Sequence, residues 1–326
     1  MLDNKNILIT GGTGSFGKKA TEIILKKYKP RRLIIFSRDE LKQFEMSQNF
    51  SMSQHPCIRY FIGDVRDKER LNRAFQGVDF IIHAAAMKQV PAAEYNPFEA
   101  VKTNIMGAQN VINAAIDQGV DKVMALSTDK AANPINLYGA TKLCSDKLFI
   151  AGNTYGSRKD TIFSVVRYGN VVGSRGSVIP YFMKFKNNGY LPITDPEMTR
   201  FWITLEQAVE FVLQCMECMC GGELFVPKIP SMNIMELARA IAPECETRIV
   251  GVRPGEKIHE LMISRDYARQ TLELDTFYVI QPRFRFWTRR SSWDEGRKVP
   301  DDFEYNSGTN PWRLSVEEMR EMLNGL

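Results

Sequence analysis

The sequence predicts an α/β protein with a doubly wound, mostly parallel sheet and a smaller C-terminal domain. Three observations lead to this fold class. Short runs of apolar and β-branched residues alternate with helix-compatible segments through about residue 170, which is the pattern of βαβ units. A glycine-rich loop follows the first run directly. Beyond residue 170 the alternation changes and loop-like segments dominate, so we expect a second, smaller unit there.

Length and composition indicate a soluble globular protein. The 326 residues are 44% apolar and 25% charged, which are ordinary values, and they suffice for a large core or for two domains. The net charge of +5 suits small anionic ligands and is too diffuse to indicate nucleic acid. No run approaches the roughly 18–20 apolar residues that span a bilayer, and the first strand begins close to Met1. We therefore expect a cytoplasmic protein without a membrane partner.

Six cysteines are present, and three of them form the cluster CMECMC at residues 215–220. Such a cluster can be a metal site. Here it ends the segment Thr204–Cys220, in which apolar residues recur at helical spacing, and the chain has only three histidines. We interpret the cysteines as buried residues of a helix and expect no metal, which also fits a reducing compartment.

The first strand, Lys5–Thr10, leads into the loop GGTGSFG at residues 11–17, and a helix-compatible segment follows. Strand, glycine loop and helix in this order bind a dinucleotide pyrophosphate at the helix N-terminus. Gly11 permits the turn, Gly14 lets backbone N–H groups approach the phosphates, and Gly17 lets the helix pack on the strand. A glycine-rich turn without a ligand is the alternative, and the flanking strand and helix argue against it. The first unit is therefore predicted to be a Rossmann-type domain.

The end of the second strand, Leu33–Phe36, indicates which dinucleotide binds. NAD-selective sites place a carboxylate there for the ribose hydroxyl, whereas NADP sites place an arginine for the extra phosphate. Here Ser37 and Arg38 occupy the strand end and Lys42 follows one helical turn later, while Asp39 comes one position too late to be the usual ribose ligand. A charged helix start without a ligand is the alternative. We interpret the cofactor as NADP.

Two further strands end in residues suited to a cofactor. The third ends in Asp64 and Val65, which should flank the adenine by position. The fourth, Phe80–His83, ends in small residues that begin at Ala84, and small residues let a cofactor lie close to the backbone. Lys88 follows and would reach a substrate hydroxyl or phosphate.

We divide the chain into two domains. Residues 1–170 form the NADP-binding domain, which includes a long helix over residues 97–118, and residues 201–226 return to it as a helix and a strand. Residues 171–200 and 227–326, with irregular connections, form the substrate-binding domain.

The segment ALSTDKAANPINLYGATK carries most of the predicted chemistry. Thr128, Asp129 and Lys130 follow the end of a parallel strand, which is where open α/β sheets bind their ligands. After an Asn-Pro break the chain forms a helix again, and Tyr138 and Lys142 share one face of it because they are four residues apart.

Tyr138, Lys142 and Thr128 suffice for the dehydrogenation of an alcohol. Free tyrosine has a pKa near 10, so a phenolate base at neutral pH needs nearby positive charge, which Lys142 and an oxidised nicotinamide would supply. Thr128 would hold the substrate hydroxyl in line. A Tyr-x-x-x-Lys pair alone is a weak signal, and the glycine loop and the strand end make it a strong one.

Asp129 and Lys130 exceed that need and indicate the reaction class. Oxidation of a sugar at C4 acidifies the hydrogen at C5, so a base there and an acid at the C6 hydroxyl would expel water. Asp129 is the candidate acid and Lys130 the candidate base. Neutralising a lysine of ordinary pKa at pH 7 costs about 4.6 kcal/mol, and we expect burial beside Lys142 and the nicotinamide to lower the pKa of Lys130. An Asp129 that caps a turn and a solvated Lys130 are the alternatives.

Six segments together resemble one family. They are similar to the inverting UDP-N-acetylglucosamine 4,6-dehydratases of bacterial pseudaminic acid synthesis, which are extended short-chain dehydrogenase/reductases. The likeness covers roughly residues 3–265. In retaining hexose 4,6-dehydratases the Thr-Asp pair is followed by Glu, whereas Lys130 holds that place here, as in the inverting family. The six segments are residues 10–17 (TGGTGSFG), 37–42 (SRDELK), 63–67 (GDVRD), 125–142, 167–177 (RYGNVVGSRGS) and 253–257 (RPGEK).

The resemblance implies UDP-N-acetylglucosamine (UDP-GlcNAc) as substrate and a tightly held NADP that is recycled in each turnover. The implied product is UDP-2-acetamido-2,6-dideoxy-β-L-arabino-hex-4-ulose, inverted at C5, as the first step of pseudaminic acid synthesis for uses such as flagellin glycosylation. The resemblance also implies a homo-oligomer, often a hexamer. By position, Lys130 would be the C5 acid/base, Asp129 its partner at C6, and Tyr138 the oxidation base.

Further site residues are implied by position. One departure is Gln89, where the family pattern has His. The implied substrate contacts are Lys88, Leu126, Ser127, Asn170, Arg200, Arg253 and Glu256. The implied cofactor contacts are Thr13, Gly14, Ser15, Phe16, Ser37, Arg38, Asp39, Glu40, Leu41, Lys42, Asp64, Val65, Ala84, Tyr138, Lys142 and Val171.

Three other functions remain open at this point. An NDP-sugar 4-epimerase would use the same Tyr138, Lys142 and Thr128 but would not need Asp129 and Lys130. A retaining 4,6-dehydratase would share the fold and most of the site. A catalytically silent NADP-binding scaffold would need neither Tyr138 nor Lys142.

Overall fold

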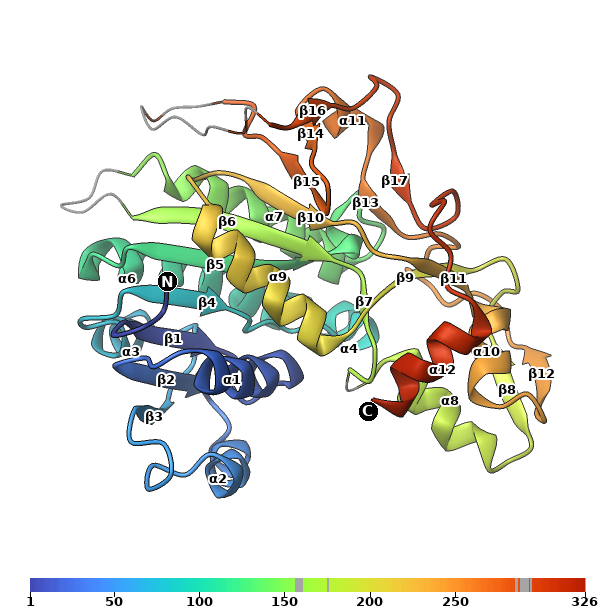
Figure 1. The fold of residues 1–326 in the computed structure, drawn as a ribbon, viewed down its shortest axis with the longest axis horizontal. Helices are drawn as coiled ribbons and strands as arrows, with labels where there is room; N and C mark the ends of the chain where they lie inside the picture. Colours follow the sequence, from blue (N-terminus) through green and yellow to red (C-terminus); the bar gives the residue numbers. More distant parts are fainter. Residues whose placement is uncertain (156–160, 175, 285–286, 288–292, 294, 326) are drawn as a thin grey trace.

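The computed structural model describes residues 1–155, 161–174, 176–284, 287, 293 and 295–325, which form a larger body around one sheet and a smaller body beside it (Figure 1). The parallel part of the large sheet confirms the predicted doubly wound fold. Its strands are β1 (Asn6–Thr10), β2 (Arg32–Ser37), β3 (Ile58–Ile62), β4 (Phe80–His83), β5 (Lys122–Thr128), β6 (Ile162–Tyr168) and β10 (Leu224–Pro227).

The strand order creates a binding position at one edge of the sheet. The parallel strands lie in the order β10-β6-β5-β4-β1-β2-β3, and every neighbouring pair among them is parallel. The chain runs outward from β1 in one direction through β2 and β3, and in the other through β4, β5 and β6. Ligands of open α/β sheets bind outside the carboxyl ends of the strands where the order reverses, here between β1 and β4.

Helices cover both faces of the sheet. In Figure 1, α9 and α1 lie across the near face and α6 and α7 behind it. Helix α1, for example, buries Ala20, Ile23 and Ile24 on its sheet-facing side. The helical segments of this body are α1 (Ser15–Lys27), α2 (Glu40–Asn49), α3 (Lys68–Ala74), α4 (Val90–Tyr95), α5 (Pro97–Val101), η1 (a π-helical turn, Lys102–Met106), α6 (Gly107–Gln118), η2 (a 3₁₀ turn, Asp129–Ala131), α7 (Leu137–Gly152) and α9 (Leu205–Cys218).

The predicted long helix over residues 97–118 forms as α5, η1 and α6 in succession. The π-helical turn η1 contains Asn104, whose buried side chain accepts a hydrogen bond from Met87 N (2.8 Å) and donates to Met87 O (2.9 Å) and Thr141 Oγ1 (3.0 Å). The Asn104 amide therefore holds the chain after β4 against α7.

The large sheet also extends beyond the predicted parallel part. Residues 227–326 were assigned as a whole to the substrate-binding domain, but three of their strands join this sheet. They are β15 (Phe277–Ile280), β14 (Thr271–Glu273) and β16 (Arg297–Lys298), and they continue it antiparallel from β10. The segment 227–326 is thus divided between the two bodies. Residues 201–226 supply β10, which pairs with β6.

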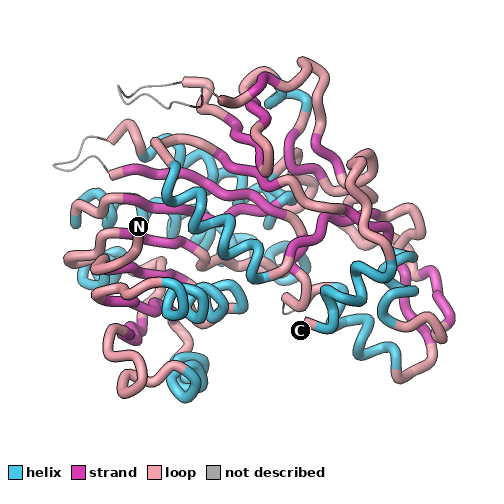
Figure 2. The backbone as a smooth tube through the Cα atoms, in the orientation of Figure 1, coloured by secondary structure: helices cyan, strands magenta, loops and turns pink. Residues whose placement is uncertain are grey.

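The smaller body has a separate apolar core. Its centre contains Phe182, Ile193, Trp202, Leu237 and Met319. Figure 2 shows this body as mostly helical, at the right of the large sheet. The other elements of this body are α8 (Val178–Lys186), β8 (Tyr190–Ile193), α10 (Ile234–Ile241), β12 (Glu246–Ile249) and α12 (Val316–Asn324). A three-stranded sheet consists of β7 (Asn170–Val171), β9 (Thr199–Ile203) and β11 (Ser231–Asn233). The buried residues of β13 (Leu261–Ile263), α11 (Arg265–Ala268) and β17 (Tyr305–Asn306) include Met262, Ala268 and Tyr305, which belong to the core of the larger body.

Two features of the described ranges bear on function class. Within them, no helix combines the length and apolar character needed to cross a membrane. The same ranges hold no group of three or more His, Cys, Asp or Glu side chains that could bind a metal ion. Of the three clustered cysteines, Cys215 is buried on α9 as predicted, whereas Cys218 is only partly buried and Cys220 lies beyond the end of that helix.

A buried histidine joins β1 to β4 beneath the glycine loop. His83 is 1% exposed, its Nδ1 lies 2.8 Å from Thr10 Oγ1, and its ring contacts the ring of Phe149. Burial, together with the charge of Lys142, lowers the pKa of His83 to about 3. The imidazole is therefore neutral in the folded protein at neutral pH.

This burial predicts a pH dependence of stability. Because the folded pKa of His83 lies below its unfolded value, the unfolded chain binds the extra proton as pH falls from about 6.5 toward about 3, and stability is lost over that window. Between pH 7 and pH 4.5 the loss from this residue should be roughly 2–3 kcal/mol. His83→Gln should start from a lower stability at pH 7 and lose less on acidification. Urea unfolding of both proteins at the two pH values measures this, and an equal loss in both would contradict it.

Candidate active site

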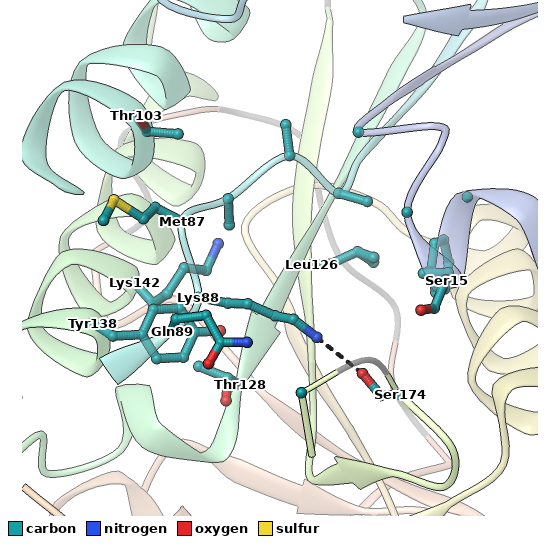
Figure 3. A pocket seen from close by; sticks show the side chains of 18 of the residues that line it. Ser15, Met87, Lys88, Gln89, Thr103, Leu126, Thr128, Tyr138, Lys142 and Ser174 are labelled. Carbon is teal, nitrogen blue, oxygen red and sulfur yellow. Dashed lines mark hydrogen bonds between the residues drawn. The ribbon is translucent and has the colours of Figure 1, made fainter. Parts of the chain in front are cut away.

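A continuous cleft of about 850 Å³ lies at the carboxyl ends of the parallel strands. All five predicted catalytic residues line it, as do most of the predicted ligand contacts. Figure 3 shows Tyr138 and Lys142 projecting into it from one helix, with Thr128 beside them. Five predicted contacts do not line the cleft: Glu40, Leu41, Arg200, Arg253 and Glu256. Arg175 of the RYGNVVGSRGS segment lies outside the described residues.

The glycine loop forms a cradle that only glycine permits. Gly11 has a φ of 65°, and a Cβ there would lie 2.8 Å from Ala85 N. A Cβ on Gly17 would overlap the carbonyl of Gly12. Gly14 is the N-cap of α1 and gives no side-chain hydrogen bond to the first turn, so backbone N–H groups of that turn face the cleft without a side-chain partner. This arrangement fits a dinucleotide pyrophosphate.

The end of β2 presents cationic side chains to the cleft. Arg38 is largely exposed, and its Nη1 lies 3.8 Å from Asp64 Oδ2. The carboxylate of Asp39 caps α2 by accepting from Lys42 N (3.0 Å), and its Oδ2 lies 2.6 Å from Lys42 Nζ. Asp39 is therefore engaged with its own helix, while Arg38 lines the cleft with most of its side chain exposed.

The predicted acid and base lie side by side on the turn η2. Thr128 ends β5 and its hydroxyl donates to Asp129 Oδ1 (2.8 Å). Lys130 Nζ lies 3.2 Å from the same oxygen. Asp129 is 1% exposed and its Oδ2 has no hydrogen-bond partner among the residues that the structure describes, whereas the Lys130 side chain is 27% exposed at the cleft.

A carboxylate that the sequence analysis missed completes this group. Glu260 Oε1 lies 3.1 Å from Lys130 Nζ and 3.8 Å from Arg200 Nε, and its side chain is buried. Arg200 also donates to the carbonyls of Thr199 and Ile258. Glu260 follows the RPGEK segment by three residues, and that short spacing was the only signal in the sequence.

These contacts overturn the expected direction for Lys130. Burial alone lowers the pKa of Lys130, as we expected, but the charges of Asp129 and Glu260 outweigh burial and raise it above its ordinary value. For Glu260, burial is outweighed by Lys130 and Arg200, so its pKa is lowered. Burial dominates at Asp129 and raises its pKa. The cluster thus favours an ammonium at Lys130 and a carboxylate at Glu260. Of the two acids, Asp129 is protonated more readily than Glu260.

Helix α7 brings Tyr138 and Lys142 against this cluster. A Cβ on Gly139 would overlap the carbonyl of Lys130, so the glycine lets the helix and the turn η2 touch. Burial raises the pKa of Tyr138 to about 12, against the opposing effects of Lys130 and the Thr128 hydroxyl. Burial also lowers the pKa of Lys142, and Asp146 opposes that shift.

Further predicted contacts line the open side of the cleft. Lys88 reaches across it and donates to Ser174 Oγ (2.9 Å), as the dashed line in Figure 3 shows. Burial lowers the pKa of Lys88. The side chain of Gln89 lies directly against Gly176, where a Cβ would collide with the Gln89 amide. One side of this opening is therefore formed by Lys88 and Gln89, which follow β4, and the other by Ser174 and Gly176, which follow β7.

The fold and the cleft together define a class of protein. A parallel sheet in this order, with the glycine cradle at β1 and a Tyr-x-x-x-Lys pair beside β5, is the architecture of the extended short-chain dehydrogenase/reductases. A family model described as a polysaccharide biosynthesis protein matches residues 7–282.

Individual relatives narrow the class. The chain is 58% identical to an inverting UDP-N-acetylglucosamine 4,6-dehydratase of Campylobacter jejuni, over 99% of this chain and 98% of that one. It is 41% identical to a UDP-glucose 4-epimerase of Rickettsia massiliae, over 99% and 96% of the two chains. The X-ray structure of Pen from Bacillus thuringiensis superposes with a TM-score of 0.90 at 37% identity, over 100% and 99% of the chains.

The chain belongs to the polysaccharide biosynthesis protein family, and within it to the family of the inverting UDP-N-acetylglucosamine 4,6-dehydratases. It is an enzyme of the hydro-lyase type, a nucleotide-sugar dehydratase. This confirms the resemblance found in the six sequence segments.

Proposed function

We propose that the protein is an NADP-dependent UDP-GlcNAc 4,6-dehydratase that inverts the configuration at C5. The observation that carries the proposal is the pair of Asp129 and Lys130, an acid and an amine that share the cleft with Tyr138. The 58% identity to the Campylobacter jejuni enzyme supports the substrate and the stereochemistry.

The residues present would hold NADP along the cleft. The glycine cradle suits the pyrophosphate, Asp64 and Val65 suit the adenine, and Arg38 and Lys42 suit the 2′-phosphate. When bound, the cofactor supplies a hydride acceptor for the alcohol at C4 and a hydride donor for C6.

Tyr138 and Thr128 would act on the C4 hydroxyl. The Tyr138 phenol is buried beside the cleft, and the Lys130 charge and the Thr128 hydroxyl lower the cost of forming its phenolate. As a base, Tyr138 would remove the hydroxyl proton while Thr128 orients the oxygen. Lys142, on the same face of α7, would orient the nicotinamide ribose.

Asp129 and Lys130 would then eliminate water. Asp129, whose pKa burial raises, would donate its proton to the departing C6 hydroxyl. Lys130 would take the C5 proton in its neutral form and, as an ammonium, return a proton to C5 once C6 is reduced. Substrate positioning would fall to Lys88, Leu126, Ser127 and Asn170, which line the cleft. The family resemblance assigns the same role to Arg200, Arg253 and Glu256, which do not line it.

An epimerase is the second candidate because a UDP-glucose 4-epimerase is 41% identical to this chain. Such an enzyme needs only the chemistry at C4, which Tyr138 and Lys142 would provide. It does not need an acid at C6 or a base at C5, and a buried Asp129 held against an amine would then have no role. Tyr138 and Lys142, both present in the cleft, argue against a silent scaffold, and an amine at position 130 argues against retention.

We further infer that the product enters pseudaminic acid synthesis, as in flagellin glycosylation, and that the enzyme is a cytoplasmic homo-oligomer. The inference rests on the likeness to the inverting dehydratases.

The reaction itself is the first prediction from this proposal. Incubated with UDP-GlcNAc, the enzyme should give a product lighter by one water, detected by mass spectrometry. In D₂O the product should carry deuterium at C5 with L-arabino geometry by NMR. An isomer of unchanged mass would indicate an epimerase, and a D-xylo product would indicate retention.

Removal of the amine should abolish most of the activity. Lys130→Ala should lower kcat by roughly 10²–10⁴-fold, because a positioned general base typically contributes that much. Lys26→Ala, which removes an exposed lysine of α1, should leave kcat unchanged. Steady-state assays of both variants measure this, and a Lys130→Ala enzyme with near-normal kcat would remove Lys130 from the mechanism.

Cofactor choice gives a separate prediction. Arg38→Ala should weaken NADP binding by roughly 10–100-fold, because a hydrogen bond to a charged group contributes about 1.5–3 kcal/mol. NAD binding should change little, since NAD lacks the 2′-phosphate. Titration calorimetry on protein freed of cofactor measures both affinities, with Arg73→Ala, an exposed arginine of α3, as control. Equal losses for the two dinucleotides would contradict the assignment of NADP.

A further inference from the structure

Glu260 is a buried charge that the proposed mechanism has not used. Its residue is 2% exposed, and Oε1 faces Lys130 Nζ at 3.1 Å. Its other oxygen, Oε2, has no hydrogen-bond partner in the described part of the chain. Burying a carboxylate with an unsatisfied oxygen is costly unless a nearby charge compensates. At Glu260 the compensating charges are those of Lys130 and Arg200.

The backbone fixes Glu260 firmly in place. Its N–H donates to Ser307 Oγ (2.9 Å), and its carbonyl accepts from Ser307 N (2.9 Å). The preceding loop is attached to the turn η2 and the start of α7. There Lys257 Nζ donates to Ala132 O (2.6 Å), and Asn136 Nδ2 donates to Gly255 O (2.8 Å). The backbone of Glu260 is therefore held beside η2 by contacts on two sides.

The groups around Lys130 come from four parts of the fold. Asp129 precedes it on η2, Tyr138 faces it from α7, Arg200 from β9, and Lys257 and Glu260 from the loop before β13. Of these, Asp129 and Glu260 favour the ammonium, and Arg200 and Lys257 disfavour it.

Of the two carboxylates beside Lys130, Glu260 alone can keep its negative charge throughout the reaction. In the proposed mechanism Asp129 carries a proton to the C6 hydroxyl, so its charge changes during turnover. Glu260 does not line the cleft and Arg200 also stabilises its charge, so it stays ionised throughout. Asp129 can exchange a proton with the substrate because it lines the cleft, and Glu260 keeps its charge because it does not.

We propose that Glu260 is a positioning residue for the reaction: its carboxylate holds the Lys130 amine at one place beside the cleft and fixes the pH range over which that amine exchanges its proton. The inference rests on the proposed function, because it assumes that Lys130 is the group that exchanges a proton with C5.

The sign of the effect follows from the charges. A carboxylate 3.1 Å from the amine stabilises the ammonium, so the amine becomes a base only at higher pH. Glu260→Gln keeps the shape of the side chain and removes its charge. Lys130 should then lose its proton at lower pH, and the acid limb of the rate profile should move with it.

The test is the pH dependence of water loss from UDP-GlcNAc in single turnovers, between about pH 6 and about pH 11, so that Glu260→Gln reaches the plateau above its acid limb. The acid limb of Glu260→Gln should lie at least about one pH unit below that of the wild type, a tenfold change in the proton affinity of Lys130. Glu260→Asp keeps the charge but withdraws it by one methylene, so its limb should lie between the two. Glu246→Gln, which changes an exposed glutamate of β12, should keep the wild-type profile.

The outcomes separate this inference from the proposed function. If the Glu260 variants have profiles that superpose on the wild type after scaling, Glu260 is only structural and the inference is wrong, while water loss by the wild type still supports the function. If the wild type releases no water from UDP-GlcNAc, the proposed function fails first. Should Glu260→Gln not fold, as judged by its thermal unfolding, the limb of Glu260→Asp decides in the same way: an unshifted limb refutes the inference.

Discussion

The close contact between helix α7 and the turn η2 is the constraint on which the site depends. Gly139 makes it possible, because any Cβ at that position would overlap the carbonyl of Lys130. The contact places the helix that carries Tyr138 and Lys142 directly against the turn that carries Asp129 and Lys130. Two pairs of groups that lie eight or more residues apart in sequence thereby share one cleft. Asn136, which caps α7 and donates to Gly255 O, ties the same contact to the loop that brings Glu260.

Buried charge is the second consequence of that contact. A charged side chain withdrawn from water needs a partner of opposite sign, and breaking such a pair leaves an uncompensated charge that is strongly destabilising. Lys130 is compensated by Asp129 and Glu260, and Glu260 in turn by Arg200. A comparable group lies one strand away, where Arg167 binds Asp146 (3.1 Å) and the carbonyl of Met262 (2.9 Å). Both groups join the part of the chain around β5, β6 and α7 to the segment around β13.

The sequence predicted those parts of the structure that depend on neighbours along the chain. The parallel strands, the glycine cradle, the turn after β5 and the Tyr-x-x-x-Lys helix are all local patterns, and the structure has them where they were expected. The sequence did not reveal the antiparallel strands β14 and β15, whose short apolar runs become strands by pairing beyond β10. The direction of the pKa shift predicted for Lys130 was wrong. Burial and Lys142 could be foreseen from the sequence, whereas the contact with Glu260 joins residues 130 positions apart and exists only in the folded chain.

This division between local and distant determinants bears on how related enzymes differ. The groups that act at C4 need only β5 and α7, so they can be shared by dehydratases and epimerases, and a UDP-glucose 4-epimerase is indeed 41% identical to this chain. An elimination across C5 and C6 additionally needs an acid and a base close together. The environment of each must give the two groups different pKa values. In this protein Lys130 of η2 faces the second carboxylate, that of Glu260, because the loop before β13 packs against η2. On the proposed function, Asp129 and Lys130 distinguish elimination from isomerisation, and the distant segment that carries Glu260 controls the charge of Lys130.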